Sequence, residues 1–137
     1  VNSARKILDF LQEKPGLKIF CAWKEDLEKV GDYKAAAIVH NQQKNGGAMM
    51  AIEIPGGRSA AFAFLDALEV FKLAVSLGST ESLAEHPASM THAGVNPEEK
   101  IRTGITEGLV RLSIGLENAD DLIADLESAL EAARLSL

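Results

Sequence analysis

Arg111 is the residue of this sequence whose type and position most plainly suggest binding chemistry. It lies in the middle of LVRLS, residues 109–113, an apolar run with the length of a strand. Successive strand residues face opposite sides of a sheet, so Val110 and Leu112 can enter a core only if Arg111 points away from it. A guanidinium offers a planar fork that binds a carboxylate through two parallel hydrogen bonds. From the residues alone, a surface salt bridge is the commoner role of such an arginine.

The histidines and the cysteine predict no metal site. His86 and His92 lie six residues apart across a proline, a spacing that matches no zinc pattern, and Cys21 stands alone. We interpret both loop histidines as structural and His40 as a surface helix residue. A metal-dependent hydrolase that uses His86 and His92 is the weakest alternative, and stoichiometric zinc in the purified protein would support it.

Three helices are predicted from apolar residues at helical spacing. The first covers residues 3–13 and has Ser3 as its N-cap. A Pro-Gly-Gly turn precedes a long helix that Ser59 caps and that ends at Ser76. Asn118 caps the last helix, whose acidic residues we expect to form a solvated face.

Four short strands separate these helices, and each is bounded by glycine, proline or another turn signal. They cover residues 17–22, 48–54, 81–85 and 109–114. A further helix is expected near residues 33–43. Strands between helices predict an α+β fold, a two-layer sandwich of a small, mostly antiparallel four-stranded sheet with helices on one face. We expect residues 1–137 to form a single domain.

Composition argues against several classes of function. The formal net charge of −6 disfavours nucleic acid as a partner, since phosphate binding needs clustered Lys and Arg. The longest apolar run, residues 59–77, is broken by charged residues and does not suit a membrane span. A single cysteine excludes an internal disulfide and fits a reducing compartment, so we expect the cytoplasm. The chain begins at Val1 without an initiator methionine, which fits a fragment or a processed product.

The most specific motifs lie in residues 76–115 and read SLG, HPASMTH and GITEGLVRLS. Together with the acidic final helix, they closely resemble the C-terminal domain of the Cys/Met-metabolism family of pyridoxal-phosphate enzymes, which have fold type I. That family includes methionine γ-lyase, cystathionine γ-synthase, cystathionine γ-lyase and the homoserine-ester sulfhydrylases. The resemblance is strong over residues 62–130 and is lost over residues 23–44.

This resemblance implies roles for five residues in binding the substrate. Arg111 corresponds to the family arginine that binds the α-carboxylate of the amino acid, and Ser76 to the serine that helps to hold it. The turn at Leu77 aims a backbone N–H at the same carboxylate, and Thr91 orients the guanidinium. From the residues alone, Ser76 is expected to bond to its own backbone, and for Thr91 a bond to its loop neighbours is an equal alternative. Val75 stands where cystathionine-handling relatives often carry glutamate, and it suits a thioether or ester side chain.

The resemblance also implies that part of an active site is missing from this chain. In the family, the lysine that binds pyridoxal phosphate belongs to an N-terminal domain, and nothing in this sequence resembles that domain. We therefore expect no catalytic or cofactor-binding residue here, and no activity of the chain alone. The complete enzyme implied is a homotetramer of the methionine γ-lyase type.

Two alternatives remain open. Within the family, the chain suits an O-acetyl- or O-succinylhomoserine sulfhydrylase, or a cystathionine γ-synthase or γ-lyase. Outside enzymes, it suits a free-standing interaction module descended from the same domain. The coding sequence upstream of Val1 distinguishes the module from the enzyme.

Overall fold

The structure is a computed structural model. It describes residues 2–14, 16–21, 48–73, 81–90, 94, 96, 98–99 and 105–137. The predicted helix near residues 33–43 lies outside the described residues, as do Val75, Ser76, Leu77 and Thr91.

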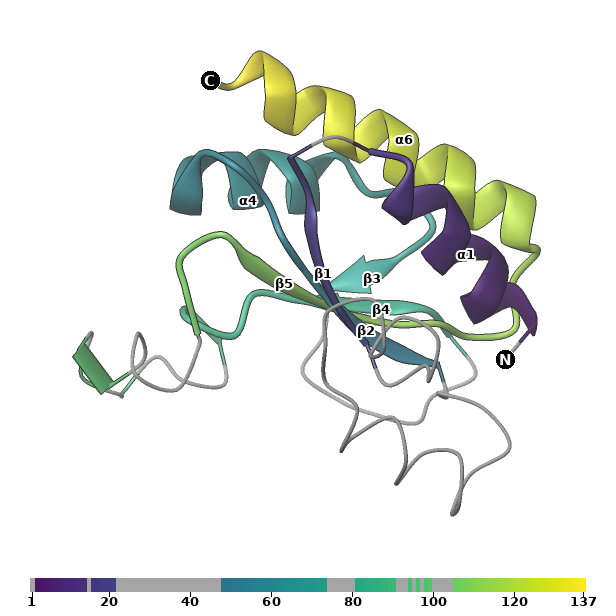
Figure 1. The fold of residues 1–137 in the computed structure, drawn as a ribbon, viewed down its shortest axis with the longest axis horizontal. Helices are drawn as coiled ribbons and strands as arrows, with labels where there is room; N and C mark the ends of the chain where they lie inside the picture. The colour runs from purple at the N-terminus through teal and green to yellow at the C-terminus, as the bar shows by residue number, and fades with distance from the viewer. Residues whose placement is uncertain are drawn as a thin grey trace.

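Three helices of the described residues cover one face of a sheet, as Figure 1 shows. They are α1 (Asn2–Gln12), α4 (Gly57–Ala67) and α6 (Ala119–Leu135). The longest, α6, packs against both α4 and α1. None of these helices is long and apolar enough to span a membrane.

The sheet contains five strands within the described residues, in the order β1-β2-β5-β4-β3. They are β1 (Lys18–Cys21), β2 (Met49–Glu53), β3 (Lys72–Leu73), β4 (Leu83–Glu85) and β5 (Leu109–Ser113). Every neighbouring pair is antiparallel except β3 with β4, which is parallel. The α+β sandwich expected from the sequence is therefore confirmed, with one edge strand more than predicted.

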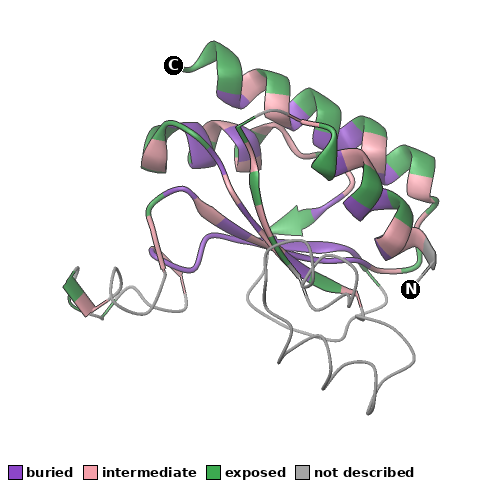
Figure 2. Cartoon of the chain, viewed as in Figure 1, coloured by how far each residue is buried: buried purple, intermediate pink, exposed green. Residues whose placement is uncertain are grey.

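The hydrophobic core lies between the sheet and the helices. Figure 2 shows buried positions on the inner sides of the helices and exposed positions on their outer sides. Helical periodicity predicts an apolar stripe on the first and on the last helix, and most of its side chains are buried, since such a stripe leaves water only by packing against another element. The buried ones are Ala4, Ile7, Leu8 and Leu11 in α1, and Leu122, Leu126, Ala129 and Ala133 in α6. Ala119, Ile123 and Leu130, which also belong to the predicted stripe, are only partly buried.

The predicted long helix is the main error of the sequence interpretation. Helix α4 ends at Ala67, Leu68 is extended, and Lys72 begins the edge strand β3. Residues 68–73, which are part of the predicted long helix, therefore do not belong to α4. The amide of Lys72 instead donates to the carbonyl of Ser82 at 2.9 Å, so contacts with distant segments override local helix propensity here.

Two of the three predicted N-caps are also wrong. Ser3 and Ser59 both lie inside their helices, because α1 begins at Asn2 and α4 at Gly57. Gly56 precedes α4 with a φ of 107°, in the left-handed region that only glycine adopts without strain. A Cβ at this position would also lie 2.8 Å from the Cβ of Ala60, which is fixed in the helix, so this close approach favours glycine as well.

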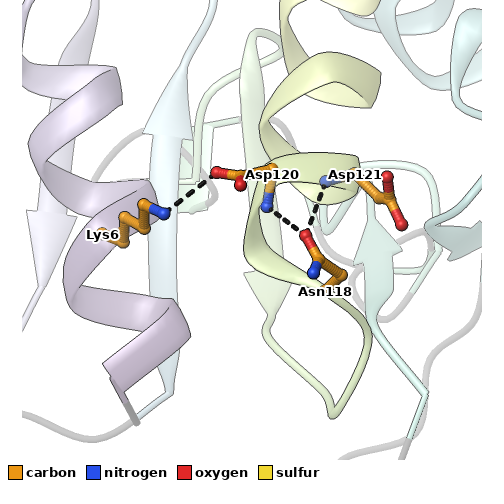
Figure 3. A network of polar contacts seen from close by, with 4 residues as sticks. All are labelled: Lys6, Asn118, Asp120 and Asp121. Atoms are coloured by element: carbon orange, nitrogen blue, oxygen red, sulfur yellow. Dashed lines mark hydrogen bonds and ion pairs between the residues drawn. The ribbon is translucent and has the colours of Figure 1, made fainter.

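The predicted cap of the last helix is confirmed. The side chain of Asn118 accepts hydrogen bonds from the amides of Asp120 at 2.8 Å and Asp121 at 3.4 Å (Figure 3). These amides have no acceptor within the helix, so the cap satisfies donors that the first turn leaves open. Lys6 of α1 contacts the Asp120 carboxylate at 3.0 Å, which links the N-terminal turn of α6 to α1.

Candidate functional site

Strand β5 places Arg111 on the face of the sheet opposite the helices. Val110 and Leu112, on either side of it, are fully buried in the core between sheet and helices. Because side chains alternate along a strand, Arg111 points the other way, and its side chain is 26% exposed. The orientation expected from the sequence is therefore observed. Its role in binding a substrate carboxylate remains a prediction.

The cross-strand neighbours of Arg111 form a row on this face of the sheet. The register pairs Phe20 of β1 with Ala51 of β2, Ala51 with Arg111, and Arg111 with Glu85 of β4. Residues directly opposite one another on paired strands share a face of the sheet. Phe20 is 53% exposed and Glu85 only 1% exposed, so the row runs from an open edge to a buried carboxylate.

Glu85 forms an ion pair with Arg111 that sequence reasoning missed. The guanidinium Nη2 donates to the Oε2 atom of Glu85. The glutamate lies just before the HPASMTH motif, where a local reading of the third strand gives it no role. The available signal was an acidic residue at the end of one predicted strand and a basic residue in the middle of another. Using that signal requires the register of the sheet, which cannot be obtained from the sequence alone.

The chain on the N-terminal side of residues 74–80 is fixed by Asp125 of α6. The carboxylate of Asp125 accepts from the amides of Glu69 at 2.8 Å, Val70 at 2.9 Å and Phe71 at 3.0 Å. Asp125 is buried, so the expectation that every acidic residue of the last helix is solvated is wrong at this position. Its spacing from Leu122 put it on the apolar stripe, which was the signal of a buried partner.

The chain on the C-terminal side of residues 74–80 is fixed by Glu117. Its carboxylate accepts from the amide of Ser82 at 2.9 Å and from the Ser82 hydroxyl at 2.8 Å. The same hydroxyl oxygen accepts from the amide of Gly115 at 2.8 Å. Burial alone would raise the pKa of Glu117, but the hydrogen bonds from Ser82 hold this pKa below its ordinary value of 4.5.

His86 is fully buried directly after β4. Its Nε2 lies 2.7 Å from the carbonyl oxygen of Glu107, and its Nδ1 lies 2.7 Å from the hydroxyl of Ser89. A carbonyl only accepts, so Nε2 carries the proton in this contact. The ring also packs edge-on against Phe62, with centroids 5.0 Å apart. The side chain of His86 therefore ties the end of β4 to the segment that leads into β5, which is a structural role.

Within the part of the chain that the structure describes, no group of three or more His, Cys, Asp or Glu is placed to hold a metal ion. His40 and His92 lie outside it, and so does the side chain of Cys21.

The lysines of the described residues do not fit a pyridoxal-phosphate site. Lys6, Lys18 and Lys72 are exposed. Lys14 holds its ammonium 4.8 Å from the centre of the Phe10 ring and faces solvent beside α6. A lysine that forms a Schiff base is instead desolvated or placed beside another cation, which makes its amine nucleophilic. No reaction step is therefore assigned to these lysines.

A groove of about 1030 Å³ lies away from Arg111, beside the last turns of α6. Ile54, Pro55, Leu130 and Leu137 supply much of its apolar surface. Arg111 and Glu85 are not among its lining residues, so the groove is not part of the candidate carboxylate site.

The chain matches known proteins along almost its whole length. The family model described as "Cys/Met metabolism PLP-dependent enzyme" matches residues 1–131. An L-methionine gamma-lyase of Fusobacterium nucleatum subsp. nucleatum is 48% identical over 95% of this chain and 32% of that protein. A cystathionine gamma-synthase of Escherichia coli is 42% identical over 96% of this chain and 33% of that protein.

A solved structure shows the same fold. Cystathionine gamma synthase from Xanthomonas oryzae pv. oryzae, in complex with aminoacrylate and cysteine, superposes with a TM-score of 0.85. The two chains are 40% identical, over 99% of this chain and 34% of that one. The chain thus spans about a third of the length of the relatives that it matches. From its sequence match and its fold, this chain belongs to the Cys/Met-metabolism family of PLP-dependent enzymes.

Proposed function

We propose that this chain binds the α-carboxylate of an amino-acid substrate within a PLP-dependent enzyme of sulfur amino-acid metabolism. The observation that carries the proposal is the partly exposed side chain of Arg111, on the face of the sheet opposite the helices. A guanidinium remains charged at physiological pH and matches the geometry of a carboxylate. Its backbone is held in the middle of a five-stranded sheet, so the fork is presented from a rigid element.

The proposal places the cofactor in a second part of the enzyme. The chain covers about a third of its relatives, and the described lysines do not fit a cofactor site. Under this proposal, pyridoxal phosphate is bound by an N-terminal domain, the present chain has no activity alone, and the complete enzyme is a cytoplasmic homotetramer. Ser76 and the Leu77 amide assist Arg111, and Thr91 orients it.

The preferred reaction is that of a methionine γ-lyase. Val75 favours an apolar thioether side chain, because a distal ammonium beside valine would lose its hydrogen-bond partner. A cystathionine γ-synthase and an O-acetyl-L-homoserine sulfhydrylase, at 42% and 43% identity, match as well as several methionine γ-lyases do. Activity of the complete polypeptide on methionine, cystathionine and both homoserine esters would separate these reactions.

Replacement of Arg111 tests the proposed carboxylate site. In the complete enzyme, Arg111→Ala should raise KM by the equivalent of about 2–5 kcal/mol, the cost of removing one partner of a buried charge pair. The absorbance of the bound cofactor should not change, because Arg111 holds the substrate and not the cofactor.

Arg111→Lys is the matched control for this replacement. It keeps the charge but not the planar fork, so its KM should lie between those of the wild type and Arg111→Ala. An unchanged KM for Arg111→Ala would show that Arg111 is only a surface residue.

A further inference from the structure

Glu85 is an acidic residue in a place that is costly for a charge. It is 1% exposed at the last position of β4. An ionised carboxylate removed from water is tolerated only when it is paired and hydrogen-bonded. The ion pair between Lys6 and Asp120, by contrast, joins two exposed groups, and such pairs contribute little.

The geometry of the pair is asymmetric. The side chain of Glu85 is buried beneath that of Arg111, and about a quarter of the arginine side chain is exposed. The backbone of Glu85 is held by pairing of β4 with β5, where Glu85 lies directly opposite Arg111. Just beyond it, buried His86 bonds to the carbonyl of Glu107, so the end of β4 cannot shift easily. The carboxylate is therefore a fixed point to which the more exposed guanidinium is attached.

We propose that Glu85 is a positioning residue that aims Arg111 at the substrate carboxylate. The inference rests on the proposed function of Arg111 and adds a residue to it. Two effects of Glu85 oppose each other. Its negative charge weakens the attraction of the guanidinium for a second carboxylate, whereas its hydrogen bond fixes the plane of the fork.

The orienting effect is expected to dominate. A bidentate contact requires the fork to lie in one plane, and an arginine without its anchor must lose side-chain freedom when the substrate binds. The opposing charge acts less strongly because Glu85 is buried beneath the guanidinium, farther than the guanidinium itself from a carboxylate bound at the exposed side.

The experiment compares single and double variants in the complete enzyme. Glu85→Ala should raise KM about 10-fold, the size of a lost hydrogen bond to a charged group, with little change in kcat. Glu85→Gln keeps an oxygen that accepts from Nη2 and removes the opposing charge, so its KM should stay within about 3-fold of the wild type. In Glu85→Ala/Arg111→Ala, KM should equal that of Arg111→Ala, because a positioning residue affects the substrate through the guanidinium that it holds.

A second readout separates positioning from general damage to the fold. Competitive inhibition by an amino alcohol that lacks the carboxylate should be the same for wild type and Glu85→Ala, while inhibition by the matching amino acid should weaken. Equal weakening for both inhibitors would overturn the inference. Additive effects of the two alanine replacements on KM would overturn it as well.

The outcome distinguishes this inference from the proposed function. If Arg111→Ala raises KM and neither Glu85 variant does, Arg111 binds the carboxylate without help from Glu85. If Arg111→Ala leaves KM unchanged, both the proposed function and the role of Glu85 fail. If Glu85→Ala does not fold, a Glu85→Gln enzyme whose KM rises as much as that of Arg111→Ala would still refute the orienting role.

Discussion

Individual carboxylates connect segments of this chain that lie far apart in the sequence. Glu85 and Arg111 are separated by 26 positions in the sequence. The separation is 35 positions for Ser82 and Glu117, and 56 positions for Glu69 and Asp125. Each carboxylate accepts from donors that are partly or fully buried. A buried donor without an acceptor costs more free energy than its hydrogen bond contributes. Removal of any of these carboxylate oxygens should therefore lower the free energy of unfolding.

The pH dependence of stability should report on Glu117. Its folded pKa is lowered, so its contribution to stability is present above pH 4.5 and is lost as the pH falls through the folded pKa. Glu117→Gln should reduce the free energy of unfolding by about 1 kcal/mol at pH 7, because one lost acceptor leaves a Ser82 donor unpaired.

Urea unfolding of the chain at a series of pH values measures this effect. The difference between wild type and Glu117→Gln should shrink as the pH falls below 4.5. A difference that stays the same between pH 7 and pH 3 would mean that the Glu117 carboxylate does not titrate with a lowered pKa.

Among the secondary-structure elements, the boundary between α4 and β3 is set by a tertiary contact. Leu68 leaves the helix with a ψ of 132°, and the next three amides bond to Asp125 instead of continuing the helical ladder. One carboxylate therefore ends α4, fixes the turn after it, and leads the chain into the edge strand β3. By resemblance, the segment that follows β3 carries Ser76, so Asp125 also holds the approach to the proposed site.

Asp125→Ala should therefore destabilise the fold strongly. Three amides lose their acceptor, one of them fully buried, and the cost should be about 3–5 kcal/mol in the free energy of unfolding. Glu127→Ala is the matched control on the same helix. The side chain of Glu127 is 64% exposed, and its carboxylate forms an ion pair with the Lys14 ammonium at 3.7 Å, near the distance limit of such a pair. It should cost less than about 1 kcal/mol. Equal costs for the two variants would contradict the role of Asp125.

At the scale of the whole molecule, the described helices cover one face of the sheet and leave the other face to other contacts. The helices α1, α4 and α6 all lie on the same side (Figure 1). The other side presents Phe20, Ala51 and Arg111 in a row, next to the buried Glu85. A face that carries both an exposed aromatic and an anchored guanidinium is typical of a contact surface, which supports the proposal that this face meets another part of the enzyme.

The isolated chain should not bind pyridoxal phosphate as an enzyme does. We expect no absorbance band of bound cofactor when the chain is titrated with pyridoxal phosphate, and no release of product from methionine. The complete polypeptide is the control, and it should show both. A band in the isolated chain that disappears when one of its lysines is replaced would contradict the proposed division of the site.

Features with short-range causes were determined by the sequence. Asn118 caps a helix through amides two and three residues away, and the pattern of Val110, Arg111 and Leu112 sets the two faces of β5. Alternation and helical spacing depend only on backbone geometry, so these features were predicted correctly. The α+β sandwich follows from them, because each apolar face must be buried against another element.

The tertiary structure alone decided which polar groups meet. It joined Glu85 to Arg111 through the register of β4 with β5, and it ended α4 at Ala67 by bringing Asp125 to the following amides. Such contacts depend on the relative placement of elements, which local propensity does not encode. The sequence thus determined which face carries the arginine, while the folded sheet decided what holds it in place.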